Sequence, residues 1–178
     1  MIYQIKRNNN SKQILRYLEI LGYTWQSGDK PTEWSPSVHH NCFTVWSEHM
    51  IIGHSMEDVT MSFEEFKRQN PIQQKHLRSG MIVEYANGKR RLVTDIMGRL
   101  VLISEDGFQP LSEYNEDLTI YDCPNTTINK VGISEPYCLD VMLKGATIIW
   151  ERPKEIELTM DEIAEKFGIS VEQLKIKK

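Results

Sequence analysis

The chain has 178 residues, 40% hydrophobic and 26% charged, with a net charge of −4. This composition predicts a soluble globular protein of one domain or two small modules, and its acidic balance disfavours a protein that coats nucleic acid. No apolar run approaches the ~20 residues of a membrane span, and the three widely spaced cysteines predict reduced thiols in the cytoplasm.

Residues 1–70 are predicted to form a small α+β module. Its first helix is predicted by apolar residues that repeat at helical spacing, namely Ile14, Leu15, Leu18 and Leu21. Gly22 stands where the terminal glycine of a helix belongs, and Tyr23 follows it. Segments 42–46 and 50–54 are rich in β-forming residues on either side of a short bend, which predicts a hairpin.

A polar segment at 71–75, which contains Pro71, is predicted to link this module to a second one at 76–153. The second module has short β-prone runs separated by glycine turns, and Asn87-Gly88 is its strongest hairpin signal. This spacing predicts a small antiparallel β module or an SH3-like β-barrel. Strands are expected at 81–85, 91–95, 99–103, 119–121, 126–131, 138–143 and 146–150.

The tail, residues 154–178, is predicted to contain two short helices that form a helix-turn-helix-like appendage. Thr159 with Glu162 forms a capping box for the first helix, and Ser170 with Gln173 forms one for the second. The second helix carries only three lysines among acidic neighbours, so we expect packing or homodimerisation rather than DNA binding. A small DNA-binding regulator is the alternative for this tail.

Charge is unevenly distributed in the second module. The predicted hairpin tip carries Lys89, Arg90 and Arg91, and Arg99 follows further along the chain. Segment 104–122 contains acidic residues and no lysine or arginine, and its candidate contact residues are Glu105, Asp106, Glu113, Glu116 and Asp117. This asymmetry favours electrostatic steering toward a protein partner, although ordinary solvated surfaces show the same pattern.

The loop from Lys30 to Trp34 is a third candidate contact surface. Pro31 stiffens the loop, and Lys30 with Glu33 supplies a pair of opposite charges. Trp34 offers an indole ring of the kind that anchors protein interfaces, although the same ring would also suit a small core.

The sequence contains no phosphate-binding loop, dinucleotide-binding glycines, or hydrolase or metalloprotease motif, so we expect no catalytic residue and no cofactor. Four histidines lie between residues 39 and 54, near Cys42. Their spacing matches no zinc module, and alternation along a hairpin would put several of them on opposite faces. We therefore expect no metal site, with a metal site or a Cys–His nucleophile as weaker alternatives.

Residues 21–28 (LGYTWQSG), 30–34 (KPTEW) and 62–66 (SFEEF) resemble the N-terminal module of small accessory proteins in phages and prophages of Gram-positive bacteria. The tail from Ile149 to Lys178 is similar to the ending of many such proteins. Those of known role are often anti-CRISPR proteins, antagonists of other defence systems, or sponges for nucleotide signals.

The resemblance implies a non-enzymatic protein in the cytoplasm of the infected bacterium. It would inhibit a host defence protein by occupying a functional surface, and a sponge that sequesters a nucleotide signal is the alternative. The resemblance supplies no catalytic or binding residue.

Overall fold

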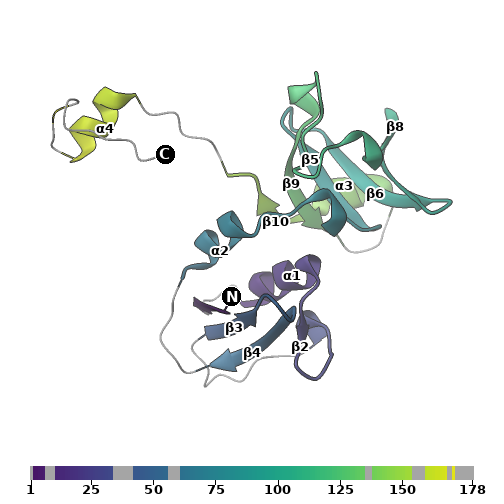
Figure 1. Cartoon of the computed structure of the whole chain (residues 1–178). Helices are drawn as coiled ribbons and strands as arrows, with labels where there is room; N and C mark the ends of the chain where they lie inside the picture. Colours follow the sequence, from purple (N-terminus) through teal and green to yellow (C-terminus); the bar gives the residue numbers. More distant parts are fainter. Residues whose placement is uncertain are drawn as a thin grey trace.

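The computed structural model describes residues 2–6, 11–33, 42–55, 61–134, 138–153, 159–167 and 170. These residues form a mixed α+β structure with two β-sheets and four α-helices (Figure 1). Among them, no helix is both long enough and apolar enough to cross a membrane.

The first sheet has the strand order β1-β3-β4-β2. Strands β1 (Ile2–Lys6) and β4 (Ile51–Ser55) pair antiparallel with the central β3 (Cys42–Trp46). The short β2 (Thr24–Trp25) pairs parallel with β4. The hairpin predicted from segments 42–46 and 50–54 is therefore confirmed.

Helix α1 (Ser11–Leu21) buries the apolar face that its spacing predicts: Ile14, Leu15, Tyr17, Leu18, Ile20 and Leu21. The helix ends at Gly22, which has a φ of +94°. The N–H of Tyr23 donates to the carbonyl of Leu18 at 3.0 Å, and that of Gly22 donates to the carbonyl of Glu19 at 3.0 Å. These are the two hydrogen bonds of a Schellman cap, so the predicted end of the helix is confirmed.

Helix α2 (Phe63–Gln69) begins at the predicted cap. The Ser62 Oγ accepts a hydrogen bond from the N–H of Glu65 at 3.2 Å. Phe66 on the next turn is fully buried and meets the ring of Tyr3 edge-on at 5.3 Å. The helix is thereby fixed against β1 of the first sheet.

The second sheet has six strands in the order β10-β9-β5-β6-β7-β8, and all neighbours are antiparallel. The strands are β5 (Met81–Tyr85), β6 (Arg90–Ile96), β7 (Arg99–Ser104), β8 (Gly107–Pro110), β9 (Ile128–Ile133) and β10 (Thr147–Glu151). The antiparallel β module and its hairpin at Asn87-Gly88 are confirmed. The described strands form an open sheet with β10 and β8 at its edges, so they do not close into the SH3-like barrel.

Two of the predicted strands are wrong. Segment 138–143 lies in helix α3 (Leu139–Gly145), where Asp140 and Lys144 form an i,i+4 ion pair at 2.8 Å that suits a helix. Segment 119–121 belongs to no described strand, and the Thr119 hydroxyl instead accepts a hydrogen bond from the Asn115 amide and donates one to the Asp117 carboxylate.

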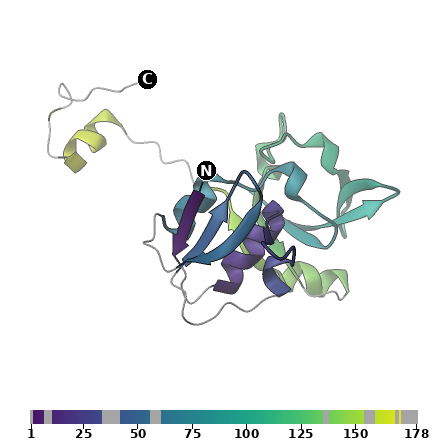
Figure 2. The same cartoon turned by 60° about the horizontal axis from the view of Figure 1, so that its bottom comes forward.

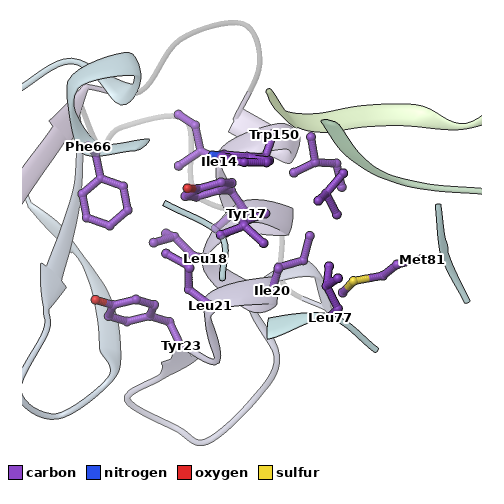
Figure 3. Packing of buried hydrophobic residues seen from close by; sticks show 14 of the residues in the cluster. Ile14, Tyr17, Leu18, Ile20, Leu21, Tyr23, Phe66, Leu77, Met81 and Trp150 are labelled. Atoms are coloured by element: carbon purple, nitrogen blue, oxygen red, sulfur yellow. The ribbon is translucent and has the colours of Figure 1, made fainter. Parts of the chain in front are cut away.

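A continuous hydrophobic core connects the two sheets through α1. Figure 3 shows α1 between two groups of apolar side chains, with Phe66 and Tyr23 on one side and Leu77 and Met81 on the other. Trp150 of β10 is 2% exposed and belongs to the same core. The N-terminal helix is thus part of the support of the second sheet.

The predicted linker segment 71–75 packs against the second module. Ile72 is 1% exposed. The Gln74 side-chain amide donates to the carbonyls of Leu111 at 2.7 Å and Tyr114 at 2.9 Å. These contacts place the short helix η2 (Gln74–His76) beside the helical turn η3 (Leu111–Glu113).

Helix α4 (Met160–Phe167) lies apart from both sheets in the two views (Figures 1 and 2). Its capping box is confirmed, because the Glu162 N–H donates to the Thr159 Oγ1 at 3.2 Å and the Thr159 N–H donates to the Glu162 carboxylate at 2.7 Å. The second helix predicted for the tail, and with it the helix-turn-helix, lies outside the described residues.

Candidate functional site

An apolar groove of about 1080 Å³ lies where η2 and η3 meet the end of the β6–β7 hairpin. Leu77, Val101 and Leu111 in its lining are buried. Three other lining residues are large, apolar and exposed, namely Ile96 at 49%, Met97 at 98% and Phe108 at 71%. Exposed apolar residues gathered at one hollow are characteristic of a binding surface.

The turn that carries Met97 has an unusual backbone. Both of its central residues have positive φ, Met97 at +54° and Gly98 at +79°. Type I′ hairpin turns require this combination, which asparagine and glycine adopt readily and methionine does not. The Asp95 carboxylate stabilises the turn by accepting a hydrogen bond from the Gly98 N–H at 2.8 Å. A bulky apolar side chain is thus held in solvent on a strained backbone.

Arg99 lines this groove together with Lys75. Both side chains are exposed, and neither forms a hydrogen bond or ion pair with another described residue. The pKa of nearby His76 is lowered to about 4 by burial and then by the charges of Lys75 and Arg78. The rim of the groove therefore carries positive charge that no described carboxylate neutralises.

The other predicted basic residues are occupied by internal contacts. The Lys89 ammonium pairs with Asp106 at 3.0 Å. The Arg90 guanidinium pairs with Glu84 at 2.7 Å and donates to the Leu143 carbonyl at 2.9 Å. Both basic side chains therefore already have partners within the chain.

Arg91 is held in the same way. Its guanidinium lies 5.6 Å from the centre of the Tyr85 ring and donates to the Gly107 carbonyl at 3.1 Å. Arg99 is at the other end of the β6–β7 hairpin, paired along the ladder with Ile96. The predicted basic patch is consequently divided between the two ends of β6.

The acidic run is also divided. Glu105 and Asp106 lie with Lys89 and Arg90 around a shallow hollow of about 500 Å³, so the structure brings these four predicted residues together. Glu113 lies elsewhere, where its carboxylate accepts a hydrogen bond from the Gln109 amide at 3.1 Å.

Glu116 and Asp117 lie in a separate turn. The Glu116 carbonyl accepts from the Gln74 N–H at 2.8 Å. The Asp117 carboxylate accepts from the Thr119 hydroxyl at 2.6 Å and from its N–H at 3.1 Å, and the hydroxyl contact is the main cause of a lowered Asp117 pKa. The Asp117 carboxylate thus stabilises its own turn, and the acidic residues of the run do not form one continuous surface.

Two stacked tyrosines, Tyr85 and Tyr114, lie beneath β8. Their hydroxyls donate to the Gln109 side-chain oxygen at 3.1 and 3.0 Å, and their ring centres are 6.4 Å apart. Burial raises the pKa of both phenols. Both phenol hydroxyls therefore stay protonated at neutral pH and serve as hydrogen-bond donors that support the sheet.

The loop from Lys30 to Trp34 is only partly described. Lys30 and Glu33 form an exposed pair at 3.8 Å, whereas Trp34 lies outside the described residues. The Trp25 indole is buried and donates to the Pro31 carbonyl at 3.2 Å, which anchors the loop to the first sheet.

The histidine cluster is also partly described. His49 is exposed on the β3–β4 turn, and the Cys42 thiol is buried and donates to the Gln4 side chain at 3.2 Å. His39 and His40 lie outside the described residues. Across the described part of the chain, no three His, Cys, Asp or Glu side chains are placed to hold a metal ion.

Sequence reasoning missed the apolar residues of the groove. Ile96 and Met97 precede a turn glycine, and Phe108 follows another. Hairpin bends normally carry small polar residues, so large apolar residues beside two bends are a signal that the sequence does contain.

Comparisons of the chain with protein-family models, with curated proteins and with solved structures find no match.

Proposed function

We propose that the chain is a non-enzymatic binding protein that inhibits a bacterial host defence protein by occupying one of its functional surfaces. The observation that carries the proposal is the groove with Met97 and Phe108 exposed at its mouth. The resemblance to phage accessory proteins supports the choice of a defence protein as the partner and the cytoplasm of the infected cell as the location.

The apolar residues account for affinity. Full burial of a large apolar side chain contributes about 1.5–3 kcal/mol. Ile96, Met97 and Phe108 lie around one hollow, so a partner side chain inserted there would bury all three at once. A compact group of this kind is sufficient for the energetic centre of a protein interface.

The charges at the rim determine the chemistry of the partner. Lys75 and Arg99 have no ionic partner among the described residues. An apolar anchor flanked by acidic side chains complements this surface, and such complementarity accelerates association and selects the partner. We therefore assign the groove to an acidic, apolar-tipped segment of the defence protein.

The test is affinity capture from lysate of a host that carries the defence system, with purified variants of the chain as bait. The unmodified chain is expected to capture one protein in stoichiometric amount, and the Met97→Glu/Phe108→Glu variant is expected to lose it. Tyr121→Glu is the matched control, because Tyr121 is 86% exposed and does not line the groove. The activity of the captured protein should fall as the unmodified chain is added.

Two results would overturn the proposal. One is a captured protein that the Met97→Glu/Phe108→Glu variant retains. The other is a second copy of this chain in the groove, which light scattering would reveal as a dimer that the same variant converts to a monomer.

A further inference from the structure

A second cleft, of about 420 Å³, lies where the N-terminal module meets the second sheet. It is bounded by α1, by the helical turn η1 (Pro31–Glu33), by the chain that enters β5 and by the ends of β9 and β10. Its volume lies within the range of about 300–1,000 Å³ that small-molecule sites occupy.

The floor of this cleft is apolar. Ile20, Met81 and Ile149 line it and are 5%, 7% and 1% exposed. A flat organic group, such as a nucleobase, would be desolvated against these side chains.

Two arginines stand at the rim of the cleft, Arg16 from α1 and Arg78 from the segment before β5. Neither guanidinium forms a hydrogen bond or an ion pair with another described residue. Guanidinium groups bind phosphate oxygens through paired N–H donors, and two of them would balance a phosphate dianion.

One carboxylate, that of Glu19, also lines the cleft. It accepts hydrogen bonds from the Thr32 hydroxyl at 2.5 Å and from the Thr32 N–H at 3.3 Å. This contact directs the carboxylate toward η1, and the lining retains an excess of positive charge.

We infer that this cleft binds a phosphorylated small molecule of about nucleotide size. Arg16 and Arg78 hold the phosphate, and the floor formed by Ile20, Met81 and Ile149 receives the organic body. The site is independent of the groove that we assign to a protein partner, because the two hollows share no lining residue.

The experiment is scanning fluorimetry followed by calorimetry on the full chain. The probes are AMP, GMP, CMP and UMP, the corresponding nucleosides, and inorganic phosphate, each at about 5 mM, since a ligand of the folded state raises its melting temperature. At least one nucleotide is expected to raise the melting temperature of the chain. The corresponding nucleoside, which lacks the phosphate, is expected to leave the melting temperature unchanged. Arg16→Gln and Arg78→Gln should each lower the affinity for that nucleotide by about tenfold, because each removes one charge-assisted contact to the phosphate.

Arg99→Gln is the matched control, because it removes an exposed arginine from the other hollow and should leave nucleotide binding unchanged. The inference is overturned if none of the four nucleotides binds, or if binding survives the Arg16→Gln/Arg78→Gln double variant. A response to inorganic phosphate equal to that of every nucleotide also overturns it, because the floor would then contribute nothing. None of these outcomes alters the result expected for the groove.

Discussion

Lys89 and Asp106 form a salt bridge of 3.0 Å that joins the β5–β6 turn to the β7–β8 turn. Lys89 of the basic tip and Asp106 of the acidic run, which look like parts of two separate surfaces in the sequence, thus neutralise each other. The hydrogen bond from Lys89 is the main reason that the pKa of Asp106 is lowered.

Lys89→Glu is expected to have little effect. Both side chains of the pair are more than 60% exposed, so the change should move the melting temperature by no more than about 2 °C. Partner capture should also stay intact, because neither residue lines the groove. A loss of partner capture would indicate that the hairpin tip at Lys89 contacts the partner.

Gly132→Ala and Gly145→Ala are a matched pair for the packing of the second sheet. A Cβ added at Gly132 would lie 2.7 Å from the Thr147 backbone oxygen on β10, whereas one added at Gly145 meets nothing within 4 Å. Overpacking should cost Gly132→Ala about 1–3 kcal/mol, and Gly145→Ala should be neutral or stabilising by up to about 1 kcal/mol because it ends a helix. Urea unfolding of both variants measures the difference, and equal stabilities would contradict the described β9–β10 pairing.

The elements that the sequence predicts correctly are those with local determinants. Ser62 with Glu65, Thr159 with Glu162, and the glycine at position 22 act within one helical turn, so their effect is visible in the chain. The strand predicted at 138–143 is wrong because the spacing of its apolar residues fits both the two-residue repeat of a strand and the 3.6-residue repeat of a helix. Leu139, Val141 and Leu143 alternate as in a strand, while Leu139, Met142 and Leu143 recur as in a helix.

The candidate groove could not be predicted in the same way. Its lining comes from three segments, 74–77, 96–101 and 108–112, that only the sheet register and η2 bring together. Arg99 alone was a predicted contact residue in this lining. The proximity of Lys89 to Asp106 was hidden for the same reason, since it depends on the pairing of β5 to β8 through two intervening strands.

Tyr114→Phe tests the hydrogen-bonded framework beneath β8. The variant removes an O–H that donates to Gln109 at 3.0 Å and lies 3.2 Å from the Thr126 carbonyl. It should lower the free energy of unfolding by about 1 kcal/mol, the usual net contribution of one hydrogen bond, because the Gln109 oxygen keeps its hydrogen bond from Tyr85. Tyr121→Phe is the control, because Tyr121 is 86% exposed and should give no measurable change in urea unfolding.

His76 gives the fold a defined dependence on pH. Its pKa is about 4 in the folded chain, lowered by burial and then by Lys75 and Arg78, against an ordinary value of 6.5. Between these two values the unfolded chain binds a proton that the folded chain does not, so this histidine's contribution to stability falls as the pH falls from 6.5 to 4. The stability of a His76→Asn variant should depend less steeply on pH across that window, and NMR titration of Arg78→Gln should show the His76 pKa moving upward.

Met97 provides a test that separates folding from binding. Its φ of +54° disfavours methionine and suits asparagine, so Met97→Asn should stabilise the chain by about 0.5–1 kcal/mol while removing the apolar side chain from the groove. Unfolding in urea should therefore show that the variant is more stable than the unmodified chain. Affinity capture should show that the variant retains less of the partner protein.

The matched control for this test is Met50→Asn. Met50 has a φ of +53° on the β3–β4 turn and does not line the groove. The Met50→Asn variant should be at least as stable as the unmodified chain and should capture the partner equally well. If Met97→Asn and Met50→Asn bind the partner equally well, the methionine in the β6–β7 turn is not a contact and the groove loses its strongest residue.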